Sequence, residues 1–178
     1  MILTRPAIAD DRDFIVSGWS ASLRSSRDIP LVPMDTYAAT FRPIVEHHLA
    51  VASALVAHGE AGVLFGFLAY DPTTYVAMLG RRRATLYGYV LYAYVAAPFR
   101  RRGVARRLFA AAGILPDQRF GYACRTRSSW ELRSKIPLAE YEPFRARYEE
   151  ITNGRRQEAA AGQSERAGTD PGENDLAP

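Results

Sequence analysis

The chain has 178 residues, enough for one domain with a buried hydrophobic core. It has no apolar run of about 18 residues and begins MILTRPAIADD, which argues against a membrane-spanning helix and against a signal peptide. Cys124 is the only cysteine, which excludes an internal disulfide and predicts a reducing, cytoplasmic setting. The formal net charge of +4 favours an acidic cofactor or substrate. Every basic residue except Lys135 is an arginine, and because genome composition can produce such a bias, it is weak evidence for nucleic-acid binding.

The first part of the chain predicts a strand and two helices. Residues 1–8 alternate loosely, as in a strand, and Asp10 or Asp11 can cap a helix that reaches about residue 23. Asp35 can cap a second helix that reaches residue 49, and Pro43 inside it predicts a kink or a split.

The middle of the chain predicts antiparallel strands. Residues 50–58 are apolar and β-compatible after a helical start, and residues 63–70 are apolar too. The two segments flank the turn sequence GEAG, so they are expected to pair as a hairpin. Asp71 and Pro72 predict the end of this second strand, and residues 75–79 form either a short strand or part of an excursion. The basic turn at residues 80–83 is expected to be solvated, with a role in steering an acidic substrate as the alternative.

The most informative segment is a strand, Tyr87 to Val95, followed by a basic turn. Three arginines and Gly103 come after the strand, and apolar residues at roughly helical spacing then predict a helix to about residue 113. Free backbone N–H groups at a helix start, the helix dipole and flanking arginines together make an anion site. The turn is therefore predicted to bind a phosphate.

The C-terminal part predicts one more strand and two helices before a tail. Residues 120–126 form the strand, and helices are expected from about Trp130 and over residues 138–151. Residues 153–178 are polar and have no periodicity, so the prediction is a domain over residues 1–152 and a disordered polar tail. The order of elements predicts an α/β layered fold with a mixed sheet.

In this order of elements, the sequence RRRGVA resembles the Gln/Arg-x-x-Gly-x-Gly/Ala signature of the GNAT superfamily of acyl-CoA-dependent N-acyltransferases. The resemblance covers roughly residues 1–150. It implies a mixed, mostly antiparallel central sheet flanked by helices. It also implies that the fourth and fifth strands, Tyr87–Val95 and Phe120–Thr126, splay apart to hold the pantetheine arm of acetyl-CoA, the implied co-substrate.

The resemblance assigns the donor site residue by residue. Val95 occupies the position whose backbone, in the family, forms hydrogen bonds to the pantetheine arm. The pyrophosphate loop is Arg100, Arg101, Arg102, Gly103, Val104 and Ala105. The small side chains of Gly103 and Ala105 allow close approach of the phosphates to the backbone.

The resemblance also offers a general acid. The segment Ala139-Glu140-Tyr141-Glu142 is similar to the family's helix after the fifth strand, in which a tyrosine protonates the leaving thiolate. Tyr141 is therefore the candidate acid, although Pro143 and Phe144 replace the usual Gly-Phe. The structural alternative is a tyrosine whose ring packs in the core with its hydroxyl at the surface.

The general base is not assigned, because the strand Tyr87–Val95 contains no carboxylate. Phenols have a pKa near 10, so tyrosines on this strand are poor bases. A water chain without a dedicated base is a further option. The side chains considered are Tyr92 and Tyr94 on the strand, Glu46, His47 and His48 on the second helix, and Glu60 in the hairpin turn.

Other reactive residue types have ordinary structural explanations. Cys124 is expected to be a small core residue, and Trp19 and Trp130 are expected to pack in the core. One cysteine and three histidines make no zinc pattern, so no metal site is predicted.

Three functions are consistent with these features. The first is an N-acyltransferase that moves an acetyl group directly from acetyl-CoA to an amine of a small molecule, protein or nucleic acid. The second is a catalytically inactive CoA-binding protein. The third is a nucleic-acid-modifying or nucleic-acid-binding protein, because FIVSGWSASLRSS, VLFGFLAY and YVAAPFRRRGVARRLF also resemble a phage and prophage subset of the superfamily. A homodimer is a further option, and no membrane partner is expected.

Overall fold

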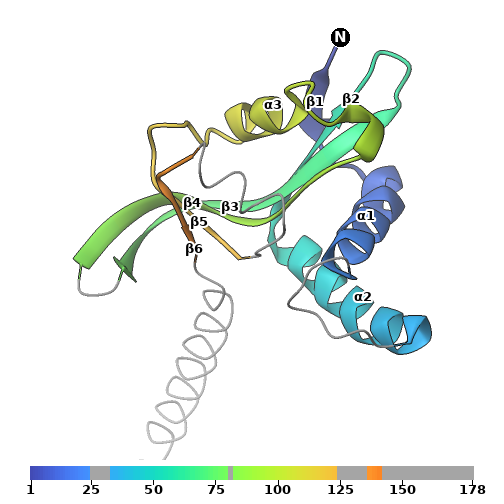
Figure 1. The fold of residues 1–178 in the computed structure, drawn as a ribbon, viewed down its shortest axis with the longest axis horizontal. Helices are drawn as coiled ribbons and strands as arrows, with labels where there is room; N and C mark the ends of the chain where they lie inside the picture. The colour runs from blue at the N-terminus through green and yellow to red at the C-terminus, as the bar shows by residue number, and fades with distance from the viewer. Residues whose placement is uncertain (25–32, 80–81, 124–135, 142–178) are drawn as a thin grey trace, which may run out of the picture. The chain divides into compact units, whose positions relative to one another are not determined.

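The fold is a layered α/β arrangement around one sheet. The computed structural model describes residues 1–24, 33–79, 82–123 and 136–141. The chain separates into two units, Met1–Glu142 and Pro143–Pro178, and the described residues all belong to the first. In that unit a six-stranded sheet has helices on both faces, as Figure 1 shows. The predicted fold class is therefore confirmed.

The sheet is mixed, with its strands in chain order from one edge to the other. The first four strands pair antiparallel and the last two are added in parallel. The strands are β1 (Leu3–Pro6), β2 (Ser53–His58), β3 (Leu64–Leu79), β4 (Arg82–Val95), β5 (Phe120–Tyr122) and β6 (Ala139–Tyr141).

Three α-helices and two 3-10 turns complete the described part of the chain. They are η1 (Ala9–Asp11), α1 (Arg12–Arg24), α2 (Met34–Val51), η2 (Ala97–Phe99) and α3 (Val104–Ala111). Two apolar clusters fill the space between helices and sheet. One joins α1 and α2 to the sheet through residues such as Trp19 and Phe67, and the other joins α3 to it through Val104 and Leu108. Figure 1 shows α3 on the opposite side of the sheet from α1 and α2.

Burial of α3 fixes the position of its N-terminus. Val104 and Leu108 are 2 % and 1 % exposed, and burying each apolar side chain contributes about 1.5–3 kcal/mol. The opposite side of the short helix carries Arg106 and Arg107, which are exposed. The apolar side therefore holds the helix on the sheet and leaves its first turn at the end of β4.

A partly buried ion pair ties β1 to the start of α1. Arg5 donates two hydrogen bonds to Asp11, from Nη1 to Oδ2 at 2.6 Å and from Nη2 to Oδ1 at 2.9 Å. The N–H group of Ile8 donates to the same carboxylate at 2.9 Å. These bonds, the Arg5 bonds above all, hold the pKa of Asp11 below its ordinary value of 3.8. Asp11 therefore caps the 3-10 turn that precedes α1 through the Ile8 N–H group, and it also holds β1 through Arg5.

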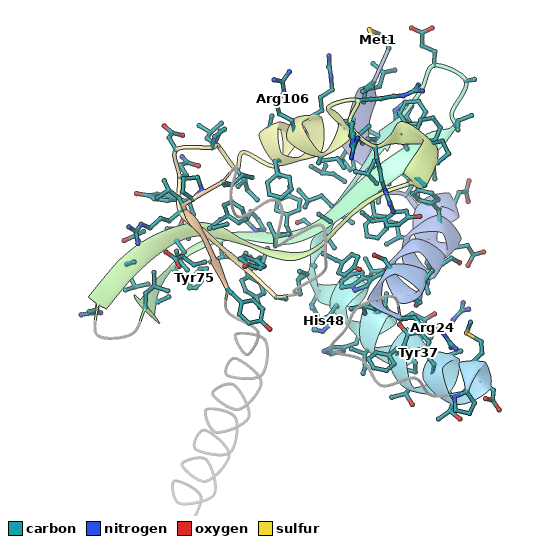
Figure 2. The ribbon with its side chains drawn as sticks, viewed as in Figure 1. Met1, Arg24, Tyr37, His48, Tyr75 and Arg106 are labelled. Atoms are coloured by element: carbon teal, nitrogen blue, oxygen red, sulfur yellow. The ribbon has the colours of Figure 1, made fainter. Side chains whose placement is uncertain are left out.

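A second contact fastens α2 to α1. The hydroxyl of Tyr37 donates a hydrogen bond to the backbone oxygen of Ser20 at 2.6 Å, and burial raises the pKa of this phenol. The guanidinium carbon of Arg24 lies 5.5 Å from the centre of the Tyr37 ring, and Figure 2 shows the two side chains together at the α1–α2 contact. The two helices are thereby held together on one face of the sheet.

The predicted end of a strand at Asp71 and Pro72 is wrong. β3 continues to Leu79, and β4 begins at Arg82 rather than at Tyr87. The register shifts between Asp71 and Thr74, so Pro72 and Thr73 form a bulge. A bulge accommodates a proline because the missing N–H group is not needed in the ladder.

The predicted split of the second helix is also absent. α2 is continuous from Met34 to Val51, and Pro43 lies inside it. Pro43 is exposed, so the backbone oxygen that loses its N–H partner can be hydrated instead. The helix also includes residues 50 and 51, which agrees with the helical start predicted for residues 50–58.

Tyr141 lies on a strand, where the sequence predicts a helix. Ala139 to Tyr141 form β6, which pairs in parallel with Phe120 to Tyr122 of β5. Ala139 is 6 % exposed, and the buried pairing with β5 outweighs the local helical pattern. The predicted helix near Trp130, the rest of the predicted helix after residue 141, Cys124 and the predicted tail at residues 153–178 lie outside the described residues.

Candidate functional site

β4 and β5 pair over a short stretch before the basic turn. The two strands pair at Tyr89 with Gly121 and at Val90 with Tyr122, and the N–H group of Ala123 donates to Val90 at 2.9 Å. β4 then continues to Val95, and no described residue of β5 pairs with this last part. The residues that follow β5 lie outside the described ranges, so the separation of β4 from β5 that the resemblance implies stays a prediction.

The backbone of the turn uses the left-handed region twice. Arg101 has φ of 63° and Gly103 has φ of 81°. A non-glycine residue in this region costs about 1–2 kcal/mol, so the conformation of Arg101 is sustained by the surrounding turn. Gly103 precedes α3, and a Cβ atom built there would meet nothing within 4 Å. Its side of the turn is therefore open to a ligand.

The turn presents a run of free backbone donors. The N–H groups of Phe99 and Arg100 bond within the 3-10 turn, and the next bonded N–H group is that of Arg107, which donates to Gly103 at 3.1 Å. Within the described part of the chain, the N–H groups of residues 101–106 have no hydrogen-bond partner. Successive N–H groups in alternating backbone conformations at a helix start make a concave anion site.

The same turn concentrates positive charge. The exposed arginines are Arg100, Arg101, Arg102, Arg106 and Arg107. None of them forms an ion pair with a described carboxylate. Figure 2 shows Arg106 extending from α3 away from the sheet. Charge and free donors therefore coincide, as a ligand with several phosphates requires.

Val95 turns its backbone polar groups away from β3. Its neighbour Ala96 donates to the backbone oxygen of Phe65 on the β3 side at 2.9 Å. Because bonded and non-bonded pairs alternate in an antiparallel ladder, the N–H and C=O groups of Val95 face away from β3. Arg100 Nε donates to the Val95 oxygen at 3.0 Å. All predicted donor-site residues thus lie on one continuous stretch at the end of β4.

Tyr141 lies next to β5. Its ring packs against that of Tyr122 on β5, with the ring centres 5.4 Å apart. Both side chains are half-buried.

The residues considered as bases are dispersed by the structure. Glu46 accepts a hydrogen bond from Arg42 at 3.0 Å and lies 3.7 Å from Arg12, so its charge is used in ion pairs. Glu60 is exposed in the hairpin turn and lies 3.8 Å from the N-terminal amine. On α2, His47 is exposed.

His48 and Tyr92, two of the residues considered as bases, belong to one aromatic stack. The His48 ring lies parallel to Trp19 at 6.2 Å, and Trp19 stacks on Tyr92 at 4.9 Å. Trp19 and Tyr92 are buried in the core, as predicted for Trp19. Figure 2 shows His48 at the end of α2 that is nearer to the sheet. Tyr94 is half-buried and packs against Phe67 at 5.5 Å.

Asp71 is the residue that sequence analysis missed. It is the only carboxylate in β3 or β4. It lies opposite Tyr89, which pairs on its other side with Gly121 of β5. The Asp71 side chain is half-buried, and its Oδ1 accepts the N–H group of Thr73 at 2.8 Å. Asp71 was missed because only the bulge and the pairing of β3 bring it to this level of the sheet.

The described residues offer neither a metal site nor a membrane-spanning helix. No group of three or more histidine, cysteine, aspartate or glutamate side chains suited to a metal ion occurs within the described ranges. Among the helices that the structure describes, none is long and apolar enough to cross a membrane.

The fold recurs in solved structures. No protein-family model and no curated protein sequence matches the chain. It resembles a histone acetyltransferase HPA2 and related acetyltransferase from Corynebacterium glutamicum, with a TM-score of 0.51 and 20 % identity over 76 % of this chain and 83 % of that one. It resembles a protein from Clostridium difficile described as a possible acetyltransferase, with a TM-score of 0.51 and 16 % identity over 80 % and 93 % of the two chains.

A third similar structure is apo YjaB from Escherichia coli, with a TM-score of 0.50 and 17 % identity over 76 % of this chain and 81 % of that one. At these identities the likeness concerns the fold. The mixed sheet and the basic turn before α3 agree with it. The chain therefore has the fold of the GNAT superfamily.

Proposed function

We propose that the protein is an N-acyltransferase that moves an acetyl group directly from acetyl-CoA to an amine. The observation that carries the proposal is the run of N–H groups at residues 101–106 at the end of β4, which have no hydrogen-bond partner among the described residues. They lie among arginines that form no ion pair with a described carboxylate. CoA carries a pyrophosphate next to its pantetheine arm. In the proposal the basic turn binds the pyrophosphate and the adjoining edge of β4 binds the pantetheine arm, in the same order as in CoA.

Each part of the turn has a role in this proposal. The N–H groups of residues 101–106 bind the pyrophosphate, and the arginines supply positive charge around it. Val95 binds an amide of the pantetheine arm through its outward-facing backbone. This arrangement leads the thioester between β4 and β5, where the resemblance implies that the strands separate.

The transfer requires two proton movements. The amine nitrogen attacks the thioester carbon, the carbon–sulfur bond breaks, and the acetyl group remains on the nitrogen. The amine gives up one proton to a base, and the thiolate of CoA takes one proton from an acid. Positioned acids and bases of this kind contribute about 10²- to 10⁴-fold each.

We assign the base role to Asp71 and the acid role to Tyr141. Asp71 is supported by its place on the strand next to β4, at the level where β5 pairs with β4. It takes the amine proton through water. Tyr141 is supported by its packing beside Tyr122 on β5. The alternative of an inactive CoA-binding protein was motivated by the absence of a carboxylate from β4. In this proposal the carboxylate of Asp71 on β3 takes that role.

Thermal unfolding with and without ligand tests the proposal. Acetyl-CoA at about 100 times its Kd should stabilise the fold by about 2.7 kcal/mol, and dephospho-CoA and ATP should stabilise it less. Gly103→Glu should abolish the effect, because a carboxylate would occupy the phosphate position. Thiol release with a panel of amines then separates a transferase from a protein that only binds CoA. If no CoA species stabilises the wild-type protein, the proposal is wrong.

A further inference from the structure

Positive and negative charge are separated along this chain. It has 19 aspartate and glutamate residues, and none of them lies between Asp71 and Asp117. The eight arginines of that stretch give it a formal charge of +8, and since the whole chain carries +4, the remaining residues carry −4. A preference for arginine over lysine does not account for this separation, because the separation consists in the lack of carboxylates. Segregated charge of this kind is typical of a surface that binds a polyanion.

The stretch includes the part of β3 and β4 that runs beyond the other strands as a two-stranded ribbon, as Figure 1 shows. β2 pairs with β3 only as far as Tyr70, and β5 pairs with β4 at Tyr89 and Val90. Residues 74–79 and 82–87 pair only with each other among the described strands. We call these two segments the outer ribbon.

The two faces of the outer ribbon differ. Tyr75 packs in the apolar cluster of α1 and α2, with its ring centre 6.4 Å from that of Tyr89. Because side chains alternate along a strand and paired residues share a face, Thr74 and its partner Tyr87 lie on the other face, that of α3. Arg83 precedes Tyr87 by four residues and shares its face. All three side chains on this face are exposed.

α3 adds further arginines to the same side of the sheet. Arg106 and Arg107 are exposed, and Figure 2 shows Arg106 extending from α3 away from the sheet. The chain then returns from α3 to the outer ribbon, where the N–H group of Tyr87 donates to the backbone oxygen of Arg119 at 2.7 Å. Tyr87 therefore lies between the arginines of α3 and Arg83.

Little negative charge offsets these arginines. Asp71 is paired with Tyr89 and so lies on the face of α1 and α2. Asp117 is exposed in the loop after α3. None of the exposed arginines between these two residues forms an ion pair with a described carboxylate. Their charge is therefore available to phosphates.

We propose that this side of the sheet binds a single-stranded nucleic acid. Arg83, Arg106 and Arg107 contact its phosphates, and the ring of Tyr87, whose residue is 47 % exposed, stacks on a base. β4 has twelve residues from Arg83 to Val95 beside the basic turn, so the surface is about 40 Å long and meets several nucleotides. A single strand is favoured over a duplex because only unpaired bases offer their faces to Tyr87. The inference goes beyond the proposed function and does not depend on it.

Fluorescence anisotropy tests the inference with a labelled single strand of about 20 nucleotides and with the corresponding duplex, between about 50 and 200 mM salt. Tyr87→Ala removes the stacking ring, and Tyr87→Phe retains it. Arg83→Gln removes one charge, and the double variant Arg106→Gln/Arg107→Gln removes two. Arg42→Gln is the matched control, because the Arg42 side chain is 58 % exposed but belongs to α2, on the other side of the sheet. Unfolding temperatures check that each variant is folded.

We expect Tyr87→Ala to weaken single-strand binding about 5- to 150-fold and to leave duplex binding within about twofold. Tyr87→Phe should bind the single strand like the wild-type protein. The slope of log K against log salt should become shallower by about 0.7 for Arg83→Gln and by about 1.4 for the double variant. Arg42→Gln should change neither the Kd nor the slope.

The inference is overturned if the wild-type protein binds no single strand. It is also overturned if Tyr87→Ala binds the single strand as tightly as Tyr87→Phe, or if the salt slopes of the arginine variants equal that of Arg42→Gln. Acetyl-CoA is added to the same proteins in the unfolding assay. Stabilisation by acetyl-CoA without strand binding rejects this inference alone, and strand binding without stabilisation by any CoA species rejects the proposed function alone.

Discussion

The Nε atom of Arg100 donates a hydrogen bond to the backbone oxygen of Val95 at 3.0 Å. This bond connects the start of the basic turn to the last residue of β4. Because a backbone oxygen has two lone pairs, the bond leaves Val95 able to accept a second donor from a ligand. Arg100 thus acts as a brace of the donor site as well as a charge.

Arg100→Ala should weaken acetyl-CoA binding more than Arg107→Ala. Both changes remove one positive charge near the turn, but only Arg100 bonds Val95. A hydrogen bond contributes about 0.5–1.5 kcal/mol, so the expected difference in Kd is about threefold to tenfold. Calorimetry on the two variants measures it. Equal losses would mean that Arg100 contributes only its charge.

Gly103→Ala should impair both stability and acetyl-CoA binding. The left-handed conformation at φ of 81° costs a residue with a Cβ atom about 1–2 kcal/mol. Gly62→Ala is a matched control, since Gly62 has φ of 77° and equally open space but lies in the β2–β3 hairpin. Urea unfolding should show similar losses for the two variants, whereas only Gly103→Ala should bind acetyl-CoA more weakly. A binding loss in both variants would point to a general effect of destabilisation.

Asp71→Asn should lower kcat/KM by about 100-fold or more if Asp71 takes the amine proton. Asparagine retains an oxygen that can accept the Thr73 N–H group, so the bulge should persist. Initial rates across pH test this, with the exposed Asp117→Asn as the control for loss of charge. Unchanged rates in Asp71→Asn would leave its carboxylate with a structural role only.

Tyr141→Phe should lower turnover by about tenfold or more and leave acetyl-CoA binding unchanged. The change removes only the hydroxyl and retains the ring that packs against Tyr122. Tyr122→Phe makes the same change on the neighbouring ring and should be nearly silent. Thiol release measures turnover. Full activity of Tyr141→Phe would exclude it as the acid.

The Arg5–Asp11 pair predicts how stability depends on pH. Since the pKa of Asp11 is lower in the folded protein, its contribution is complete above the ordinary value of 3.8. This contribution is lost as pH falls through the lower folded pKa. At pH 7, Asp11→Ala should cost about 1.5–3 kcal/mol in unfolding free energy, the usual range for hydrogen bonds to a charged group, because the partly exposed Arg5 can be hydrated without its partner.

Urea unfolding of wild-type and Asp11→Ala proteins from pH 7 to pH 2 measures this contribution. The stability difference between the two proteins should shrink only at the acidic end. A constant difference throughout would show that the charge of Asp11 does not stabilise the fold.

The sequence predicted the strand, the basic turn and the helix start of the proposed donor site because these elements are local. The strand to Val95, the arginines, Gly103 and the amphipathic start of α3 are consecutive, and their geometry follows from neighbouring residues. The hairpin at residues 59–62 was predicted for the same reason and is confirmed.

Features that depend on distant pairing were not predictable. Pro72 suggested a strand end, but pairing with β4 carries β3 past it as a bulge. Residues 139–141 have a helical pattern, but pairing with β5 makes them a strand. Asp71 could not be chosen because its place opposite Tyr89 depends on that register. The acceptor side of the site therefore required the structure. The narrower likeness to phage and prophage proteins stays a prediction.

The central claim is that acetyl-CoA binds the free N–H groups after β4, and a titration observed by ¹H–¹⁵N correlation spectroscopy tests it most directly. As acetyl-CoA is added, the amide signals of residues 101–106 should shift first and furthest, with that of Val95. The signal of Gly62, in a similar glycine turn elsewhere, should stay in place. Saturable binding that leaves the signals of residues 101–106 unmoved would contradict the account.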